Sequence, residues 1–452
     1  MEPLGLYIHI PFCVRKCRYC DFLSAPGKEE TMRAYTRALL REIRLRARHM
    51  RGELFQKHPV DTIFFGGGTP TALPADCLSL ILYTIREGFD VLPDAEITCE
   101  MNPGTFVEDA ACRSEEEGRR KSKRSDLDQE LLHFLTQSVN RVSIGLQSVH
   151  NRELSTLGRI HSFQDFQACF AALRRFGAKN ISVDLMFGLP GQTPAGWEES
   201  LRTVAELSPE HISAYGLILE ESTPFFSMEE RGVFTGELSL PDEETERQMY
   251  RAAGRILSDY GFRRYEISNY ARPGFESRHN GRYWQRRPYL GFGLGAASFF
   301  DHRRWRNTRS LETYLSVLEE EPCRSFGQAG NSERQTVRKT SFEDKKATQR
   351  KKDLEKEPLS VEALEREAER LSEKAEMEEF MFLGLRMDRG ISETAFARAF
   401  GKPITAVYGE VLSRLEAGGL LRPRKEDNTG YWSLTDRGLD ISNRVLAEFL
   451  LT

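Results

Sequence analysis

The sequence predicts an α/β fold in which a partial (β/α) barrel is followed by a small C-terminal α+β domain of the winged-helix kind. Two observations support this prediction. Over roughly the first two hundred residues, short apolar runs alternate with helical stretches, which is typical of right-handed βαβ units and a parallel sheet. Towards the C-terminus, several helical patterns are followed by one short β-like segment, the order of a winged-helix unit.

The expected barrel strands are short and rich in apolar or β-branched residues. They lie at 6–10, 62–65, 96–100, 141–145, 180–186 and 211–219, and a helix is expected over 30–48. Polar residues of interest fall where these strands end, and parallel α/β proteins place their ligands at that edge.

Two segments dense in both charges, 112–128 and 324–358, interrupt this order. Their mixed-sign charge favours solvated insertions or linkers over basic interaction tails. The predicted division is a core at 1–235 that contains the first insertion, a core extension at 236–323, the linker 324–358 and a C-terminal domain at 359–452.

The C-terminal domain has helical patterns and then a β-like segment. The helices are expected at 364–373, 375–385, 393–400 and 404–417, the segment at 431–434, and a last helix after it. A DNA-reading role and a role in packing or partner docking both fit such a domain, and its weak basic bias gives the first no advantage.

Composition and charge exclude several classes of function. The chain has 64 Lys+Arg and 68 Asp+Glu, a formal net charge of −4, so a general nucleic-acid binder, which needs a basic excess, is not expected. No apolar stretch reaches the length of about 18 residues that a membrane span needs. The N-terminus resembles neither a secretory signal nor an import leader, so a cytoplasmic location is expected.

Cys13, Cys17 and Cys20 form the strongest local signal in the sequence. Thiolates are preferred ligands of iron–sulfur clusters, and a short loop bearing three of them can bind three irons of a cube. The remaining iron then keeps an open position for a substrate or cofactor. The alternatives are three unrelated thiols or a zinc loop without its fourth ligand, for which His9, on the first expected strand, is poorly placed. The other cysteines are expected to be mostly small buried hydrophobes: Cys77, Cys99, Cys112, Cys169 and Cys323.

The segment YIHIPFCVRKCRYC resembles the cluster loop of the radical-SAM superfamily, in the form used by its HemN/HemW branch. The resemblance implies a [4Fe–4S] cluster on the three cysteines, with S-adenosylmethionine at the open iron. It runs from about residue 5 to 310 and resumes at residue 378. Tyr19 stands where this superfamily packs an aromatic ring near the adenine.

Further positions resemble the S-adenosylmethionine site of the family. Gly67, Gly68 and Thr69 follow an apolar strand, and glycines there let the backbone approach a ligand; in the family this motif contacts the methionyl ammonium. Glu100 ends another strand, where a carboxylate suits ribose hydroxyls or the amino group. The remaining lining positions implied by the resemblance are Tyr7, Gln147, Arg159, Asp184 and Ile218.

For two of these residues, side-chain chemistry also supports a place in a ligand site. Arg159 suits a carboxylate or a second charged ligand, because its guanidinium forms bidentate hydrogen bonds. Asp184 lies on an otherwise apolar strand, where burial without a partner is unfavourable.

The segment His279-Asn280-Gly281-Arg282-Tyr283-Trp284 matches the HNxxYW motif associated with haem binding in HemW-type haem chaperones. Neutral imidazole is a good axial haem ligand, and Tyr283 and Trp284 offer aromatic surface. In a helix, His279 and Tyr283 share a face. Spacing alone favours a structural aromatic corner with a hydrogen-bonded histidine, whereas the resemblance favours a haem site.

The oxygen-independent coproporphyrinogen dehydrogenases of this branch have a further cysteine two residues after the third. Phe22 occupies that position here, which counts against dehydrogenase activity. The resemblance therefore implies a haem chaperone whose partners are haem and acceptor apo-haemoproteins, membrane-associated ones included, and it allows a homodimer. A radical-SAM enzyme is the alternative.

Overall fold

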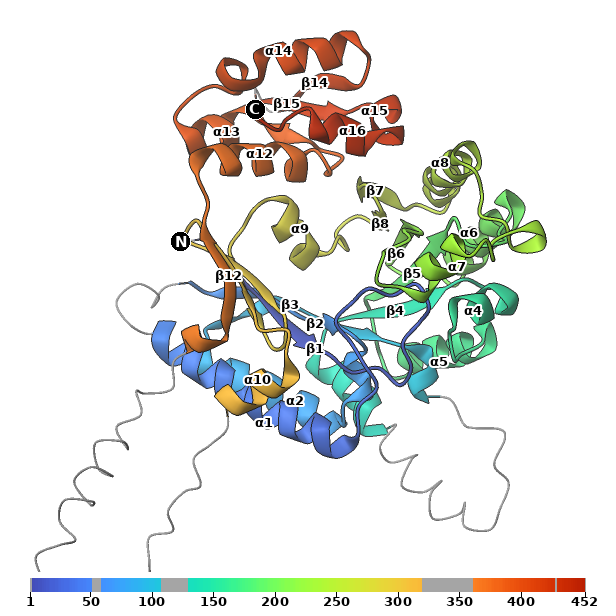
Figure 1. Ribbon diagram of the computed structural model, residues 1–452, viewed down its shortest axis with the longest axis vertical. Coiled ribbons are helices and arrows are strands. Elements are labelled where there is room, and N and C mark those ends of the chain that lie inside the picture. Colours follow the sequence, from blue (N-terminus) through green and yellow to red (C-terminus); the bar gives the residue numbers. More distant parts are fainter. Residues whose placement is uncertain (1, 51–57, 107–128, 319–360, 427–428, 452) are drawn as a thin grey trace, which may run out of the picture.

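The computed structural model describes residues 2–50, 58–106, 129–318, 361–426 and 429–451. Both charged segments predicted from the sequence, and with them Cys112 and Cys323, lie outside these residues. A 12-stranded sheet forms the body of the molecule, and a separate 3-stranded sheet belongs to the C-terminal domain (Figure 1).

Six parallel strands in chain order form the centre of the large sheet. They are β1 (Leu4–Ile10), β2 (Val60–Gly67), β3 (Val91–Met101), β4 (Arg141–Gln147), β5 (Ile181–Phe187) and β6 (His211–Gly216). The helices that follow them include α1 (Glu29–Met50), α2 (Ala75–Gly88), α4 (Asn151–Leu157), α5 (Phe163–Arg175), α6 (Pro194–Glu206), α7 (Pro224–Glu230) and α8 (Glu243–Asp259). The six predicted strands and the first predicted helix are confirmed, although β6 ends earlier than expected.

The two faces of the central strands differ in character, because successive side chains of a strand point to opposite sides. On β1, Leu6, Ile8 and Ile10 are fully buried in the hydrophobic core, to which α1 and α2 also contribute. Tyr7 and His9 face the other side, which we call the inner face. That face holds most of the polar residues singled out by the sequence.

Short strands extend the sheet at both ends, and its two edges do not pair within the described residues. Beyond β1 lie β9 (Tyr289–Phe292), β10 (Ala297–Phe300), β11 (Arg303–Asn307) and β12 (Glu365–Arg370); beyond β6 lie β8 (Asn269–Ala271) and β7 (Arg263–Glu266). Helix α9 (Arg278–Trp284) lies across the amino-terminal part of β2, and α10 (Leu311–Val317) packs on α1. The fold is therefore a partial (β/α) barrel, as predicted.

The C-terminal domain has the helix and strand order of a winged-helix unit. Its elements are α12 (Glu373–Gly384), β13 (Ile391–Ser392), α13 (Glu393–Phe400), α14 (Ile404–Ala417), β14 (Leu421–Glu426), β15 (Thr429–Leu434), α15 (Asp436–Asp440) and α16 (Ser442–Ala447). The helices expected from 375 onwards are confirmed, and two short helices replace the single last one. This domain has its own hydrophobic core.

The helix expected over 364–373 is wrong, because 365–370 forms the edge strand β12. Its alternating Glu and Arg residues pair with β11, and Glu365 forms ion pairs with both Arg46 and Arg303. Ladder hydrogen bonds and these ion pairs outweigh the helix propensity of Glu, Ala and Arg, which is a weak preference.

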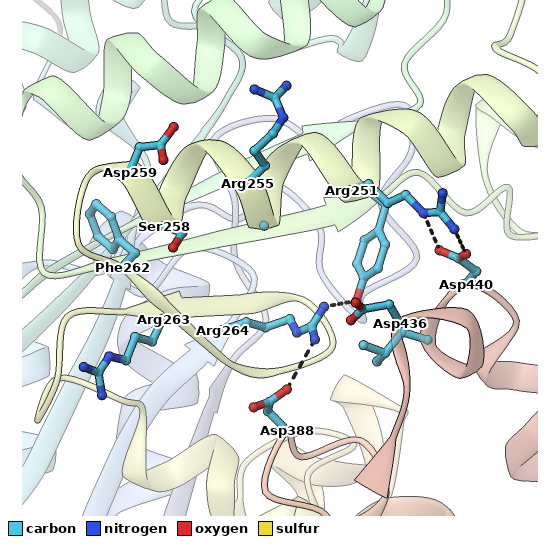
Figure 2. A pocket seen from close by; sticks show the side chains of 13 residues that line it. Arg251, Arg255, Ser258, Asp259, Phe262, Arg263, Arg264, Asp388, Asp436 and Asp440 are labelled. Carbon is cyan, nitrogen blue, oxygen red and sulfur yellow. Dashed lines mark hydrogen bonds and ion pairs between the residues drawn. The ribbon is translucent and has the colours of Figure 1, made fainter. Parts of the chain in front are cut away.

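The C-terminal domain docks on β7, β8 and α9 (Figure 1). The Ile267 N–H donates to the Arg386 carbonyl over 3.1 Å, and the Asp388 N–H donates to the Tyr265 carbonyl over 3.0 Å. An open cavity of about 1010 Å³ lies between α8, β7 and this domain, and Figure 2 shows the side chains that line it. Its arginines are largely paired, Arg251 with Asp440 and Arg264 with Asp388.

None of the helices in the described ranges combines the length and the apolar character needed to cross a membrane.

Candidate metal and cofactor site

The three cysteines lie on one loop directly after β1, at the carboxyl edge of the sheet. Cys13 is buried, whereas Cys17 and Cys20 are partly exposed. Two backbone hydrogen bonds form the base of the loop: the Cys13 N–H donates to the Ala25 carbonyl, and the Ala25 N–H donates to the Pro11 carbonyl. The loop is thus held at both ends while its thiols stay free of disulfides.

Neighbouring elements also hold this cysteine loop. The Arg18 N–H donates to the Leu157 carbonyl at the end of α4, and the Arg18 carbonyl accepts from the Phe225 N–H at the start of α7. Arg18 Nη1 donates to the Thr156 carbonyl over 3.2 Å. These contacts bring segments more than a hundred residues apart against the loop and fix its position.

Two thiols receive hydrogen bonds from the surrounding protein. Thr69 Oγ1 donates to Cys13 Sγ over 3.6 Å, and Arg159 Nη1 donates to Cys17 Sγ over 3.4 Å. Such donors stabilise thiolates and cluster sulfurs, and they tune a cluster's potential. The donor set therefore fits a cluster bound through Cys13, Cys17 and Cys20.

Within the part of the chain that the structure describes, no set of three His, Cys, Asp or Glu side chains is arranged as ligands of a single metal ion. The thiolates of a cube each bind a different iron, so they need not converge on one point. The geometry consequently gives no support to the zinc loop that the spacing had left as an alternative.

The glycine loop after β2 touches the cysteine loop through its backbone. The Gly68 N–H donates to the Ile10 carbonyl, and the Thr69 N–H donates to the Phe12 carbonyl. A Cβ atom on Gly68 would lie 2.6 Å from the Phe12 carbonyl oxygen, and Gly67 has a φ of +107°. Only glycine fits this turn and this approach.

Glu100 and Asp184 are carboxyl groups on the inner face. Burial and, after it, the nearby charge of Asp184 raise the pKa of Glu100 to about 8. Glu100 Oε2 accepts a hydrogen bond from the Gly67 N–H over 3.2 Å. Burial also raises the pKa of Asp184, which accepts from the Ser143 hydroxyl.

Gln147 and Arg159 lie at the carboxyl end of β4. Gln147 is the last residue of the strand and has a φ of +79°, a left-handed conformation that is uncommon for a non-glycine residue and is often found at functional sites. Arg159 hydrogen-bonds the Gly145 carbonyl as well as Cys17. The structure thus brings Arg159 to the cysteine loop, as a cofactor site requires.

The other two predicted lining positions of this edge differ in exposure. Tyr19 packs against a small apolar cluster, and so do Leu217 and Leu219, just after β6. Ile218, between them, is 69% exposed. The segment that carries it nevertheless adjoins the cysteine loop, since Ser222 hydrogen-bonds Asp21.

His279 lies inside the partial barrel and not on its surface. It is fully buried on α9, and its ring stacks on Phe64 with centroids 5.1 Å apart. Its Nδ1 is hydrogen-bonded to the Thr62 hydroxyl over 3.0 Å, and its Nε2 to the Tyr283 hydroxyl over 2.8 Å. Burial lowers the pKa of His279 to about 3, with Arg282 and Arg141 adding to the effect. The imidazole is therefore neutral, and both of its nitrogens have partners.

Helix α9 is positioned by residues that sequence reasoning did not select. The Glu96 carboxylate on β3 accepts hydrogen bonds from the Arg278 and His279 N–H groups at the helix start. Arg282, 1% exposed, forms a buried ion pair with Asp61 and donates to Thr62. The sequence signal that could have identified Glu96 is a polar residue within an apolar run.

The rest of the motif connects α9 to its surroundings. The Tyr283 ring packs edge-on against Tyr289, with centroids 4.7 Å apart. Trp284 lies under the Arg386 guanidinium of the C-terminal domain at 4.4 Å, and its buried indole Nε1 has no hydrogen-bond partner in the part of the chain that the structure describes. Predicted residues Tyr7 and His279 meet on the inner face, with ring centroids 6.5 Å apart.

Comparison with known proteins identifies the class of protein to which the fold belongs. Residues 7–204 match the family model of the radical SAM superfamily, and residues 371–441 match that of the HemN C-terminal domain. A solved structure titled "Coproporphyrinogen III oxidase (HemN) from Escherichia coli is a Radical SAM enzyme" has a TM-score of 0.70 at 21% identity, over 99% of this chain and 90% of that one. The fold and the cysteine loop are thus those of the radical-SAM proteins, a class that uses a [4Fe–4S] cluster and S-adenosylmethionine.

Curated relatives identify the family within this class. "Heme chaperone HemW" of Lactococcus lactis is 31% identical over 451 residues, covering 100% of this chain and 98% of that protein. "Heme chaperone HemW" of Synechocystis sp. is 37% identical over 326 residues, covering 71% of each. The chain belongs to the HemW family.

Proposed function

We propose that the protein is a haem chaperone that binds haem and delivers it to acceptor apo-haemoproteins. Three observations support the proposal: the family to which the chain belongs, the HNxxYW helix on the inner face, and Phe22 at the position where the dehydrogenases have a fourth cysteine. The observation that carries it is His279, a neutral histidine within reach of the cofactor-lining residues.

In this proposal Cys13, Cys17 and Cys20 hold the [4Fe–4S] cluster. The cluster leaves one iron free to bind the amino and carboxylate groups of S-adenosylmethionine. The glycine loop 67–69 and Glu100 present acceptors and backbone groups to its polar end. Tyr7, Tyr19, Gln147, Arg159, Asp184 and Ile218 line the rest of the site.

His279 is the proposed haem ligand, and binding requires a local rearrangement. Its Nε2 must leave the Tyr283 hydroxyl before it can bind iron, while the Thr62 hydroxyl can keep hold of Nδ1 and so orient the ring. Tyr283 and Trp284 would then offer aromatic surface to the macrocycle. Because the imidazole is already neutral, it needs only the tautomer with its proton on Nδ1 to present the Nε2 lone pair to iron.

The test is a haem titration of the purified, cluster-loaded protein and of His279→Ala. We expect the variant to lose most of the binding; unchanged affinity would remove the proposed ligand. The matched control is His58→Ala, since His58 is a half-buried histidine just before β2 that hydrogen-bonds the Glu2 carbonyl and packs edge-on against Phe300.

Turnover of coproporphyrinogen III distinguishes the chaperone from the radical enzyme. We expect none under anaerobic, reducing conditions, and protoporphyrinogen formation would overturn the proposal. A reducing cytoplasmic compartment, membrane-associated acceptors and a homodimer belong to the same proposal, supported by free cysteines and by the family.

A further inference from the structure

Arg141, at the amino-terminal end of β4, is a buried cation whose side chain has no hydrogen-bond or ion-pair partner among the described residues. It is 2% exposed. Its Nε has no hydrogen-bond partner, and within the described ranges its guanidinium forms no side-chain hydrogen bond or ion pair. Arginine cannot shed its proton in a protein, so the charge persists. An uncompensated buried charge is costly, and folded proteins rarely retain one without a use.

The other buried arginines of this chain are paired with carboxylates. Three arginines are buried in the described part of the chain. Arg46 pairs with Glu42 and Glu365, and Arg282 pairs with Asp61. Even at the open cavity of Figure 2, Arg251 and Arg264 each have a carboxylate. Arg141 is the exception among these residues.

The position of Arg141 points to the inner space of the partial barrel. It shares a face of β4 with Ser143, whose hydroxyl bonds Asp184. Burial is the main cause of the low pKa values of His279 on α9 and His211 on β6. The charge of Arg141 contributes to both, after Arg282 in the case of His279. Arg141 thus lies on the inner face, near both α9 and β6.

Neither nearby carboxyl group compensates the charge. The charge of Arg141 acts to lower the pKa of Glu100 and of Asp184, but burial outweighs it and raises both pKa values. No ion pair joins either carboxyl group to Arg141 within the described residues. A planar guanidinium fork matches a carboxylate with two parallel hydrogen bonds. We infer that Arg141 is an anion-binding residue that takes a carboxylate of a ligand admitted to the inner space of the barrel.

This inference deepens the proposed function and rests on it for the ligands. Haem carries propionate carboxylates, which present the chemistry that Arg141 recognises. The methionyl carboxylate of S-adenosylmethionine is assigned to the open iron at the carboxyl edge, so this cofactor serves as the control ligand.

The experiment compares wild type, Arg141→Met and the matched control Arg282→Met in cluster-loaded protein. Thermal unfolding is measured without haem or S-adenosylmethionine. We expect Arg141→Met to unfold at the same or a higher temperature, because it removes an uncompensated charge. Arg282→Met, which strands the buried Asp61, must unfold at a lower temperature. A structural role for Arg141 would make the two variants alike and would overturn the inference.

Binding is then measured with haem, haem dimethyl ester and S-adenosylmethionine. A loss of about 10- to 100-fold for haem in Arg141→Met, without loss for the ester, assigns a propionate. The affinity for S-adenosylmethionine is expected to stay at the wild-type value. Wild-type haem affinity in the variant, or an equal loss for haem and its ester, overturns the inference. Failure of wild type to bind haem would refute the proposed function alone, since the comparison of thermal unfolding still tests Arg141.

Discussion

Tyr283→Phe is expected to tighten haem binding. In the structure, the Tyr283 hydroxyl is the hydrogen-bond partner of His279 Nε2, 2.8 Å away, and the imidazole is fully buried. Removing the hydroxyl leaves a buried nitrogen unsatisfied, which costs the haem-free protein about 1–3 kcal/mol. Iron coordination at Nε2 supplies the missing partner, so the haem-bound form does not bear this cost.

Thermodynamic linkage then fixes the size of the effect, since the stability lost by the haem-free protein reappears as affinity. A cost of about 1–3 kcal/mol corresponds to haem binding about 5- to 150-fold tighter than in wild type. The assay pairs denaturant unfolding of the haem-free protein with absorbance titration by haem. Equal or weaker haem affinity in Tyr283→Phe, with the stability loss present, would refute the idea that His279 binds iron through this nitrogen.

Three further predictions concern the cysteine loop, the domain contact and a buried carboxyl group. Gly68→Ala should reduce iron and sulfide content after anaerobic reconstitution, because its Cβ would meet the Phe12 and Ile10 carbonyls at 2.6 and 2.9 Å; Gly409→Ala, which meets nothing within 4 Å, should not. Glu379→Ala should lower the free energy of unfolding by about 1–3 kcal/mol, because Arg304 loses this carboxylate and Arg286 keeps Glu376 alone of its two carboxylates; the exposed pair partner Glu426→Ala should change it by less than about 1 kcal/mol. The raised pKa of Glu100 means that the folded protein binds this proton more tightly than the unfolded chain, so stability falls as pH rises between about 4.5 and 8. Thermal unfolding of ligand-free Glu100→Gln should show a smaller decline over this range, and an unchanged profile would contradict the assignment.

The central strands were predictable because their signal is local. Each is a run of apolar residues long enough to be recognised alone, and the two cofactor loops follow such runs directly. Strands β7 to β11 have only three to five residues each, and no period can be read from so short a segment. The strand β12 was mistaken for a helix because its partner, β11, is more than fifty residues away in sequence.

The site residues that could be predicted from the sequence are again those whose signal is local. The cysteines and the glycine loop carry their chemistry in adjacent residues, whereas the place of His279 inside the barrel depends on Thr62, more than two hundred residues before it. The hydrogen-bonded histidine that spacing alone favoured is what the structure shows, and the haem role stays a proposal. Arg141 gave no signal of its own, because a missing partner is visible only once the strands are assembled.

The most direct test of the account is Mössbauer spectroscopy of the anaerobically reconstituted protein with and without S-adenosylmethionine. We expect one [4Fe–4S] cluster bound through Cys13, Cys17 and Cys20, in which the signal of a single iron changes when S-adenosylmethionine is added. Absence of a four-iron cluster, or a spectrum that the cofactor leaves unchanged, would contradict it.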